Sequence, residues 1–339
     1  MNLKYGSNSL NSTTYLIQFA SMNIWILFAI LFSSSAFSKT TFEQWKQSYI
    51  KKAATRGIPK TFSKEVFKKL TFDQTVVDKD RNQIIFSKET DYPSFIKRWL
   101  RDDNKRIEQG LKLLKENREL LEKVEKKYGV EKEVIVSLWG VETFYGNITG
   151  DFNVINSLAT LVYDGRRRSF YETQLNAALR LVYKGHVKFE DFKGSWAGAT
   201  GQCQFMPSNI PVYGQDFNQD GKIDIWNTKA DVFASIANFL KKVGWKKGKS
   251  IGSLAVNTKD KELNLDRYRS YKQYNQLGFR TLNGEKFRNP KWRRRRAAKI
   301  PLKDSPVVLR GSNFDPLLRW NRSSLFAAFN IILLDSFMK

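Results

Sequence analysis

Cysteine and histidine are almost missing from the 339-residue sequence, which contains one of each, Cys203 and His186. A single cysteine excludes an intramolecular disulfide and every zinc module built from several cysteines. A single histidine leaves too few nitrogen ligands for the zinc sites that depend on histidine. Any metal ion bound by this chain must therefore be held by oxygen atoms.

Acidic residues are scarce relative to basic ones. The chain has 58 Lys and Arg against 33 Asp and Glu, which gives a formal charge of +25 at pH 7. A hydrophobic fraction of 41% is that of a folded chain, and the length fits one large domain or about two to three small ones. The excess positive charge indicates a polyanionic partner, which can be nucleic acid, an acidic membrane surface or an acidic wall polymer.

The N-terminal part contains an uncharged apolar run, Ile24–Phe32. The run is too short to span a bilayer, which takes ~20 residues. Together with the small residues Ala36 and Ser38, placed as in a cleavage site, it predicts a secretory signal peptide over residues 1–38. The alternative is a buried N-terminal helix. Because the run has no cysteine, there is no lipoprotein attachment site, and we expect an exported protein that is soluble or tethered by an uncleaved signal.

The remaining sequence divides into four regions. Residues 39–128 are rich in Lys and Glu with apolar residues at helical spacing, which predicts a helical N-terminal domain. In residues 129–245, Trp, Gly, Asn and Asp cluster in short motifs between helical stretches. Catalytic and binding residues often lie in such connecting segments. Residues 246–310 are basic and interrupted by Gly, which predicts a small β-containing insertion. Apolar spacing returns in residues 311–339 as a closing helix, so the predicted fold class is mainly α (α+β).

One carboxylate belongs to the apolar face of a predicted helix that a glycine ends. Ile135 and Glu142 lie two turns apart on one face, and Trp139 is one turn before the carboxylate. A carboxyl that is desolvated among aromatic side chains has a raised pKa, as a general acid near neutral pH requires. The alternative is a structural glutamate paired with an arginine. Glu131 and Glu133, by contrast, are expected in the exposed first turn.

Six motifs stand out along the chain: Gly140–Gly146, Gly150–Arg167, Gly194–Ser208, Asp224–Asn227, Ser235–Leu240 and Leu318–Ser323. They resemble motifs of the membrane-bound lytic transglycosylase B family of murein-cleaving enzymes. They follow one another in the order of that family over nearly the whole mature chain. The resemblance implies a lysozyme-like catalytic core, with a helical domain before it and a small β domain inserted late, as in the four regions above.

The resemblance implies cleavage of the β-1,4 bond between N-acetylmuramic acid and N-acetylglucosamine, with the muramyl 6-hydroxyl attacking to give a 1,6-anhydro product. Glycosidases with two carboxylates need the second one as nucleophile or base. Here the nucleophile belongs to the substrate, so Glu142 alone would protonate the leaving oxygen and later accept the hydroxyl proton. The alternative is a non-catalytic peptidoglycan-binding or scaffold protein of the same fold.

The resemblance also assigns substrate contacts to polar residues outside the helix of Glu142. Ser195 and Gln204 offer hydroxyl and amide groups that bond sugars without adding charge, although alone they are typical turn residues. Asn321 matches an Asn near the catalytic Glu of the family, and its alternative role is to cap the closing helix. Arg166 and Arg167 match a basic pair that either meets substrate carboxylates or braces the cleft.

Aromatic residues complete the expected substrate site. Trp320 and Phe326 stand where the family often carries Tyr, so a phenolic hydrogen bond is absent while stacking on a sugar survives. Tyr145 is a third expected aromatic contact. Cys203 has no histidine near it in the sequence and is expected to be a small packed residue.

Residues 216–231 fit the first part of an EF-hand calcium loop, with oxygen ligands at positions 1, 3 and 5 and glycine at position 6. Position 12 is Asn227, which cannot bind in a bidentate manner, and Asp231 would replace it in a longer loop. The alternative is an Asx-rich turn without metal. We expect a structural Ca²⁺ and no cofactor for catalysis. The expected ligands are the side chains of Asp216, Asn218, Asp220 and Asp231 and the carbonyl of Lys222.

The basic run Lys291–Lys299 can bind nucleic acid, anionic lipid or the acidic wall, or it is a solvated charged face. The signal peptide and the absence of a nucleic-acid-binding motif oppose the first of these. We therefore expect a periplasmic monomer that acts on peptidoglycan glycan strands, touches an anionic membrane at its periphery and binds no nucleic acid. An uncleaved signal would tether it to the inner membrane.

Overall fold

The computed structural model shows a mainly helical chain with small antiparallel sheets, which confirms the predicted fold class. Residues Thr41–Lys339 form one compact unit. No helix in the described part of the chain combines the length and the apolarity that crossing a membrane requires. The predicted signal peptide, residues 1–38, lies outside the described residues. These are residues 40–82, 91–101, 104–259, 264–288 and 294–339.

Helices fill the first of the four regions. The first of them begins with a capping box, in which Thr41 Oγ1 accepts the N–H of Gln44 and Gln44 Oε1 accepts the N–H of Thr41. The division of the chain at residue 128 stays a prediction. The helices of this region are α1 (Phe42–Thr55), α2 (Lys60–Lys68), α3 (Gln74–Arg81), α4 (Tyr92–Trp99), α5 (Lys105–Glu116) and α6 (Arg118–Tyr128).

The second region is also helical, with a two-stranded antiparallel pair that joins β1 to β2. The pairing sets Phe152 opposite Gly194 and so fixes the start of a long loop that returns toward the helices. The elements are α7 (Lys132–Thr143), β1 (Phe152–Asn153), α8 (Val154–Asp164), α9 (Arg168–Tyr183), β2 (Lys193–Gly194), the 3-10 turn η1 (Pro207–Asn209), α10 (Ile210–Tyr213) and α11 (Lys229–Lys242).

The third region holds the predicted β structure, a four-stranded antiparallel sheet in the order β4-β3-β6-β5. Its inner face has a hydrophobic cluster of its own around Tyr274, Phe279 and Leu309. The small core explains how this strongly basic segment still folds. The elements are β3 (Gly252–Asn257), α12 (Tyr271–Gln276), β4 (Phe279–Arg280), β5 (Ala297–Lys299) and β6 (Val307–Arg310).

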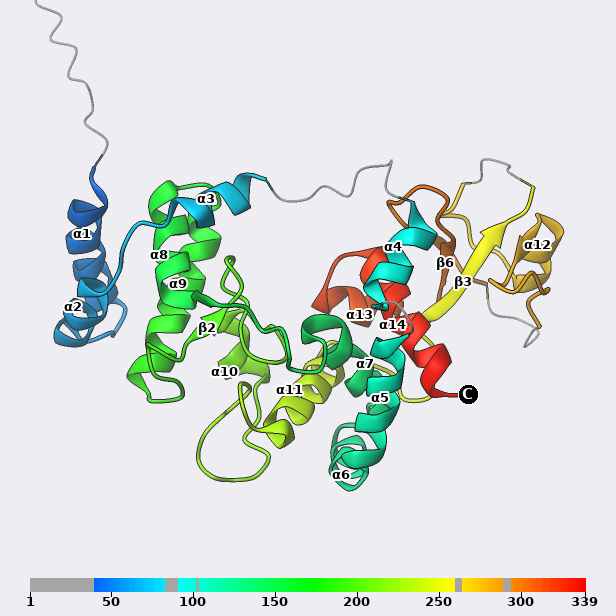
Figure 1. Cartoon of the computed structure of the whole chain (residues 1–339), viewed down its shortest axis with the longest axis horizontal. Coiled ribbons are helices and arrows are strands. Elements are labelled where there is room, and N and C mark those ends of the chain that lie inside the picture. The colour runs from blue at the N-terminus through cyan, green and yellow to red at the C-terminus, as the bar shows by residue number, and fades with distance from the viewer. Residues whose placement is uncertain (1–39, 83–90, 102–103, 260–263, 289–293) are drawn as a thin grey trace, which may run out of the picture. The chain divides into compact units, whose positions relative to one another are not determined.

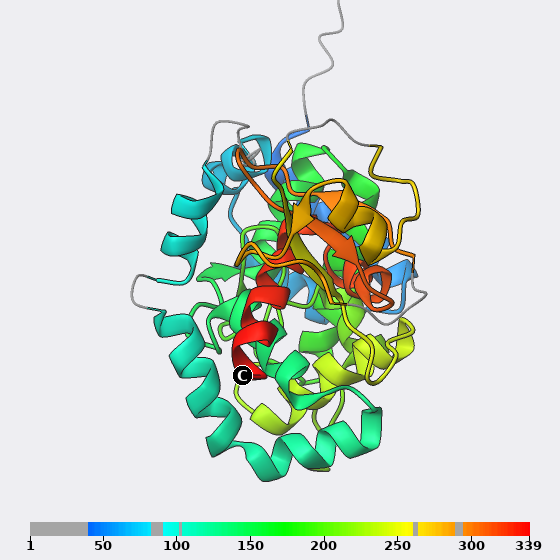
Figure 2. The ribbon, with the colours of Figure 1, turned by 90° about the vertical axis from the view of Figure 1, so that its right-hand side faces the viewer.

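The last region contains two helices where the sequence predicts one. They are α13 (Phe314–Trp320) and α14 (Ser324–Phe337). The chain is extended at Asn321, with φ −141° and ψ 122°, and Ser323 Oγ then accepts the N–H of Phe326 to begin α14. The polar segment between the two helices thus ends one and caps the next, which leaves Trp320 at a helix end. Helix α14 also contacts β3 and β6, beside which it runs in Figure 2.

Helix α7 is the central element of the fold. It packs against α5, α6, α11 and α14 (Figure 1), and every residue from Val134 to Gly140 is buried. The polar Ser137 is satisfied inside this core because its hydroxyl bonds to Asn330 Oδ1 of α14 at 2.8 Å. A helix that is buried on all sides is a rigid support for the residues at its end.

Candidate active site

Glu142 lies in the last turn of α7, close to an unusual helix end. The helix ends at Thr143, three residues before the glycine that the sequence predicts as its terminator. Phe144 and Tyr145 take left-handed conformations, with φ of 50° and 60°. A left-handed backbone conformation costs of order 1–3 kcal/mol per non-glycine residue. It persists only where surrounding contacts impose it. The end of α7 is therefore held in place by tertiary structure.

Arg106 supplies part of that restraint, and sequence analysis did not find it. Its guanidinium donates to the carbonyl of Gly140 and lies over the ring of Phe144, 4.9 Å from its centre. Tyr145 in turn donates its hydroxyl to the carbonyl of Arg106 at 2.6 Å. Arginine is common in this sequence, so no pattern distinguishes Arg106 until α5 and α7 are seen side by side.

The carboxyl of Glu142 is half-buried and has a single hydrogen-bond donor among the described residues. Trp320, at the end of α13, donates its indole N–H to Glu142 Oε1 at 2.7 Å. Burial raises the pKa of Glu142 to about 7, while the hydrogen bond from Trp320 works in the opposite direction. The group is therefore partly protonated near neutral pH, as a general acid must be.

The loop after β2 docks onto α7 through Gln202, which sequence analysis also missed. Gln202 Oε1 accepts the indole N–H of Trp139 at 2.9 Å, and its amide donates to the carbonyl of Trp226 at 2.7 Å. Thr143 fixes the same loop because its hydroxyl donates to the carbonyl of Gln202 at 2.8 Å. Cys203 follows in the loop and is fully buried, and burial together with the charge of Glu142 raises the pKa of its thiol.

Ser195 and Gln204 belong to this same loop. Ser195 Oγ accepts the N–H of Ala199 at 3.0 Å, which is a turn contact. Gln204 has a left-handed backbone and donates its amide N–H groups to the carbonyls of Thr149 and Gly201. Its amide oxygen accepts no hydrogen bond from the described residues, so it is available to a ligand. The contact of either residue with a substrate stays a prediction.

Two of the expected aromatic contacts need correction. Tyr145 and Phe326 are each only 5% exposed and belong to the hydrophobic core. The hydroxyl of Tyr145 is already bonded to Arg106, and Phe326 lies in the first turn of α14. Neither side chain presents a face to a sugar, so both support the site from within the core. Periodicity alone could not separate a core aromatic from one that lines a cleft.

Arg166 and Arg167 join the start of α9 to α3. Both form ion pairs with the fully buried Asp80 of α3, Arg166 at 2.8 Å, and Tyr171 donates a hydroxyl hydrogen bond to the same carboxylate. Burial opposes the ionisation of Asp80, but hydrogen bonds from Arg167, Tyr171 and Arg166 outweigh it and lower its pKa. Both arginine side chains remain nearly half exposed, and their contact with a substrate stays a prediction.

Asn321 is exposed at the end of α13, next to Trp320. A cavity of about 510 Å³ opens beside this helix end and is lined by Tyr213, Phe239 and Arg319, among others. The rings of Phe239 and Trp320 meet edge to face with centroids 4.7 Å apart. Trp320, which contacts Phe239 of the cavity lining, also donates the hydrogen bond to Glu142.

The predicted calcium ligands lie in a loop whose carboxylates bond to its own backbone. Asp216 accepts the N–H groups of Asp220 and Gly221, and Asp231 accepts those of Phe217 and Asp224. Among the described residues, no three Asp, Glu, His or Cys side chains gather closely enough to hold a metal ion. The carboxylates are thus bonded to N–H groups of their own loop, as in an Asx-rich turn, and the calcium site stays a prediction.

The loop nevertheless keeps the chemistry of a calcium site. Asp231 is fully buried at the start of α11, and its pKa is raised by burial and, to a lesser degree, by the charge of Asp216. Two carboxylates that repel each other in this way would be relieved by a divalent cation. The oxygen-only donors also suit Ca²⁺.

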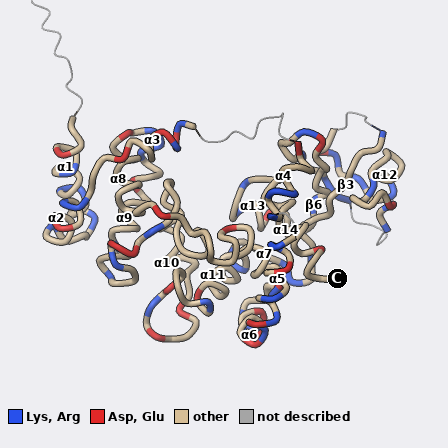
Figure 3. Tube along the Cα trace, viewed as in Figure 1, with Lys and Arg blue, Asp and Glu red and all other residues tan. Residues whose placement is uncertain are grey.

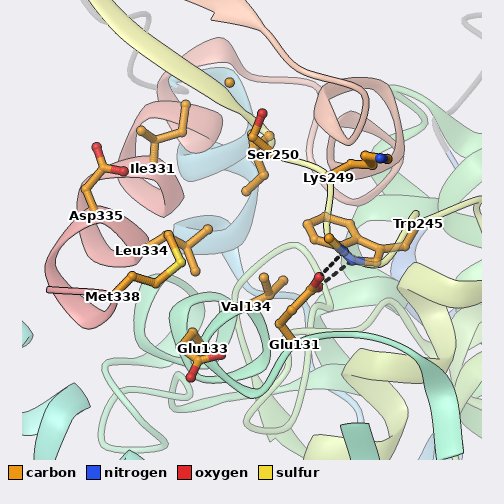
Figure 4. Close-up of a pocket in the computed structure, with 13 residues that line it drawn as sticks. Glu131, Glu133, Val134, Trp245, Lys249, Ser250, Ile331, Leu334, Asp335 and Met338 are labelled. Atoms are coloured by element: carbon orange, nitrogen blue, oxygen red, sulfur yellow. Dashed lines mark hydrogen bonds between the residues drawn. The ribbon is translucent and has the colours of Figure 1, made fainter. Parts of the chain in front are cut away.

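The first turn of α7, at the opposite end of the helix, is less exposed than the sequence predicts. Glu131 and Glu133 are half-buried and line a cavity of about 360 Å³ with Trp245 and Leu334 (Figure 4). The carboxylate of Glu131 accepts the indole N–H of Trp245 at 2.9 Å and the N–H of Gly248 at 2.5 Å. Glu131 therefore ties α7 to the segment that leads from α11 into the sheet.

Comparison with known proteins decides the family. The family model described as "Transglycosylase SLT domain" matches residues 41–334. The chain belongs to the transglycosylase SLT domain family. Within it, membrane-bound lytic murein transglycosylase B of Escherichia coli (strain K12) is 34% identical over 160 residues, which are 47% of this chain and 44% of that protein. The matched part thus spans less than half of that relative.

Two solved structures have a similar fold. SltB3 from Pseudomonas aeruginosa, in complex with NAG-anhNAM-pentapeptide, is 34% identical with a TM-score of 0.76, over 88% of this chain and 80% of that one. Escherichia coli Slt35 in complex with calcium is 24% identical with a TM-score of 0.73, over 89% of this chain and 94% of that one. At this lower identity the second likeness shows the fold alone.

Proposed function

We propose that this member of the transglycosylase SLT domain family is a lytic murein transglycosylase. It cleaves the β-1,4 bond between N-acetylmuramic acid and N-acetylglucosamine of peptidoglycan and leaves a 1,6-anhydromuramyl end. The observation that carries the proposal is the carboxyl of Glu142, which is held by Trp320 and has a pKa raised to about 7. The match of residues 41–334 to the family model supports it.

The reaction needs one protein carboxyl in two protonation states. Protonated Glu142 gives its proton to the glycosidic oxygen as the bond to the muramyl C1 breaks. The carboxylate so formed then accepts the proton of the muramyl 6-hydroxyl, whose oxygen bonds to C1. The proton returns to Glu142, so the carboxyl is restored and no water is consumed. Trp320 keeps Oε1 as an acceptor, which leaves Oε2 to carry the proton.

The substrate surroundings follow from the same loop and helix end. Ser195, Gln204 and Asn321 would bond the sugar hydroxyl and acetamido groups, and Arg166 and Arg167 would meet substrate carboxylates with their exposed edges. That SltB3 was solved with a NAG-anhNAM-pentapeptide supports a glycan with a peptide stem as the ligand here. Like the expected signal peptide, this substrate implies a periplasmic location, with peptidoglycan strands as the partner of a monomer that touches anionic membrane at its periphery.

The deciding experiment compares wild type and Glu142→Gln on purified sacculi, with mass spectrometry of the released fragments. Wild type should release anhydromuropeptides, and Glu142→Gln should lower that release by at least about a thousandfold, since an amide is far too weak an acid to protonate the leaving oxygen. Glu119→Gln, an exposed change in α6 with the same chemistry, is the control and should behave as wild type. If wild type binds sacculi but releases nothing, the protein is instead a peptidoglycan-binding scaffold.

A further inference from the structure

The basic run at the end of the insertion has no part in the proposed reaction, and its described residues do not form a plain solvated face. Arg294, Arg295 and Arg296 lead directly into β5, which pairs with β6. The N–H of Arg310, the last residue of β6, donates to the carbonyl of Arg296 at 2.9 Å. The antiparallel pairing therefore brings Arg310 to the three consecutive arginines. Figure 3 shows the basic character of the chain around β3, β6 and α12.

These four residues line one cavity, which we name the arginine pocket. It has a volume of about 330 Å³, and its other side chains include Tyr268 and Asp315. Asp315 is the single carboxylate in the lining and is taken by an ion pair with Arg310. The pocket thus concentrates positive charge that the described residues do not neutralise.

Most of the guanidinium donors in the pocket have no acceptor. The side chains of Arg294 and Arg296 make no hydrogen bond or ion pair with any described residue. Arg295 donates one bond, from Nη1 to the carbonyl of Arg310 at 3.1 Å, while its Nε is buried without a partner. A buried donor without an acceptor is costly, and most such groups in folded proteins are satisfied. The arrangement is therefore incomplete without a ligand that accepts hydrogen bonds.

Aromatic rings hold three of the guanidinium groups in fixed positions. Arg295 lies over Tyr271, Arg296 over Tyr268 and Arg310 over Phe314, with distances to the ring centres of 5.1, 5.1 and 4.8 Å. Cation–π contacts of this kind restrict long side chains that would otherwise sample many rotamers. A ligand entering the pocket would meet donors that are already oriented, so little entropy is lost on binding.

We propose that the arginine pocket is a binding site for a phosphate group. Guanidinium forks match the oxygens of phosphate in bidentate pairs, and a phosphate presents more acceptor oxygens to convergent donors than a carboxylate does. The phosphate belongs to a lipid headgroup or is free in solution. Tyr268, which is 56% exposed beside the pocket, is the kind of residue that lies at a membrane interface. The site is separate from Glu142 and extends the proposed function.

The first test titrates the full chain with inorganic phosphate by calorimetry at constant ionic strength, with acetate as the carboxylate probe. We expect saturable phosphate binding that is weakened at least about tenfold in the double variant Arg294→Gln/Arg296→Gln, because each lost bond to a charged group removes roughly that factor. Lys60→Gln/Lys64→Gln removes the same charge from exposed positions of α2 and should leave binding unchanged. Equal binding by wild type and the arginine variant, or equal affinity for acetate and phosphate, would overturn the site.

The second test separates the two sources of phosphate. Wild type and both double variants are sedimented with vesicles of phosphatidylcholine alone, or of phosphatidylcholine and phosphatidylglycerol in equal parts. A selective loss of binding to the anionic vesicles in the arginine variant assigns the site to a lipid headgroup. Equal vesicle binding, with the phosphate difference retained, assigns it to free phosphate. Release of fragments from sacculi should be the same in all three proteins, which keeps this test independent of the active site.

Discussion

At the scale of single residues, the bond between Trp320 and Glu142 sets the chemistry of the site. An indole N–H only donates, so Glu142 Oε1 is its acceptor in both protonation states of the carboxyl. The bond favours the ionised form and moderates the rise in pKa that burial causes. The acid is thereby kept at a pKa of about 7, from which it can both give and recover a proton.

Removing this donor should move the pH dependence of the reaction. In the proposed reaction Glu142 works when protonated, so activity should fall as pH rises through its pKa of about 7. In Trp320→Phe the pKa of Glu142 rises further, and the descending limb should move up by about one pH unit, which corresponds to a charge-assisted bond of about 1.5 kcal/mol. Trp320→Tyr keeps a hydrogen-bond donor, so its descending limb should lie at the same pH as that of wild type. The shift is measured from the rate of fragment release as a function of pH. A Trp320→Phe profile whose descending limb lies at the same pH as that of wild type would contradict the prediction.

The place of Glu142 in a largely apolar helix could be predicted from the helical spacing of its neighbours, while its catalytic role stays a prediction. The donor role of Trp320 could not be predicted, since the sequence indicates a stacking residue and only the packing of α13 shows where its N–H points. Gln202 and Arg106 were missed for a related reason. Their partners lie far away in the chain, Trp139 for one and Gly140 for the other, and neither residue type is rare enough to be noticed.

At the scale of elements, the loop after β2 depends on a close backbone approach at Gly194. A Cβ atom there would collide with the carbonyl oxygen of Ala199 and meet Val154 Cγ2 at 3.0 Å. Because the Ala199 carbonyl belongs to the backbone, it cannot move away by a change of rotamer as a side chain can. The loop that carries Gln202 and Gln204 to α7 therefore requires glycine at this position.

The variant Gly194→Ala should consequently be both less stable and less active. Overpacking of this kind costs about 1–3 kcal/mol, and the displaced loop would carry its glutamines away from the end of α7. Thermal unfolding and fragment release from sacculi measure the two effects. Lys193→Ala, an exposed change in the same strand, is the matched control and should alter neither. Wild-type stability in Gly194→Ala would show that the loop can move.

We propose that the loop of residues 216–231 takes up Ca²⁺, as the sequence predicts, and this proposal carries a second prediction at this scale. Calcium should raise the melting temperature of wild type, and a chelator should lower it again. Saturation at about 100 times the dissociation constant corresponds to about 2.7 kcal/mol. Asp216→Asn removes one of the two repelling carboxylates and should abolish the calcium response, whereas Asp304→Asn, outside the loop, should retain it. A wild-type melting temperature that ignores calcium would refute the proposal.

Element types were predictable where composition is distinctive, as in the β-containing insertion. Their ends were not. Helix α7 stops at Thr143 because Arg106 and Tyr145 impose left-handed backbone on residues that do not favour it. The closing helix divides because Ser323 caps a new helix after the extended Asn321. Both outcomes depend on tertiary contacts that local pattern does not contain.

At the scale of the whole molecule, the charge of +25 governs how the protein meets its proposed substrate. Peptidoglycan carries peptide carboxylates, and attraction between opposite charges raises the rate of encounter by about 10 to 1,000 times. Because added salt shortens the screening distance from ~10 Å at 0.1 M to ~3 Å at 1 M, this attraction weakens steeply with ionic strength. The proton transfer at Glu142 takes place in a partly buried site and should be little affected.

We therefore expect salt to separate binding from chemistry. The Glu142→Gln variant should not digest sacculi, so its binding can be measured on intact sacculi. This binding should weaken by at least about tenfold between 0.1 M and 1 M NaCl. The turnover of wild type on a short, uncharged glycan at saturating concentration should change much less, since Glu142 and Trp320 are screened by the protein. Sedimentation of sacculi and the rate of anhydro product formation give the two quantities. Salt-independent binding would mean that the positive charge serves some other surface, such as the membrane, and that the glycan is recognised through the neutral groups of Ser195 and Gln204.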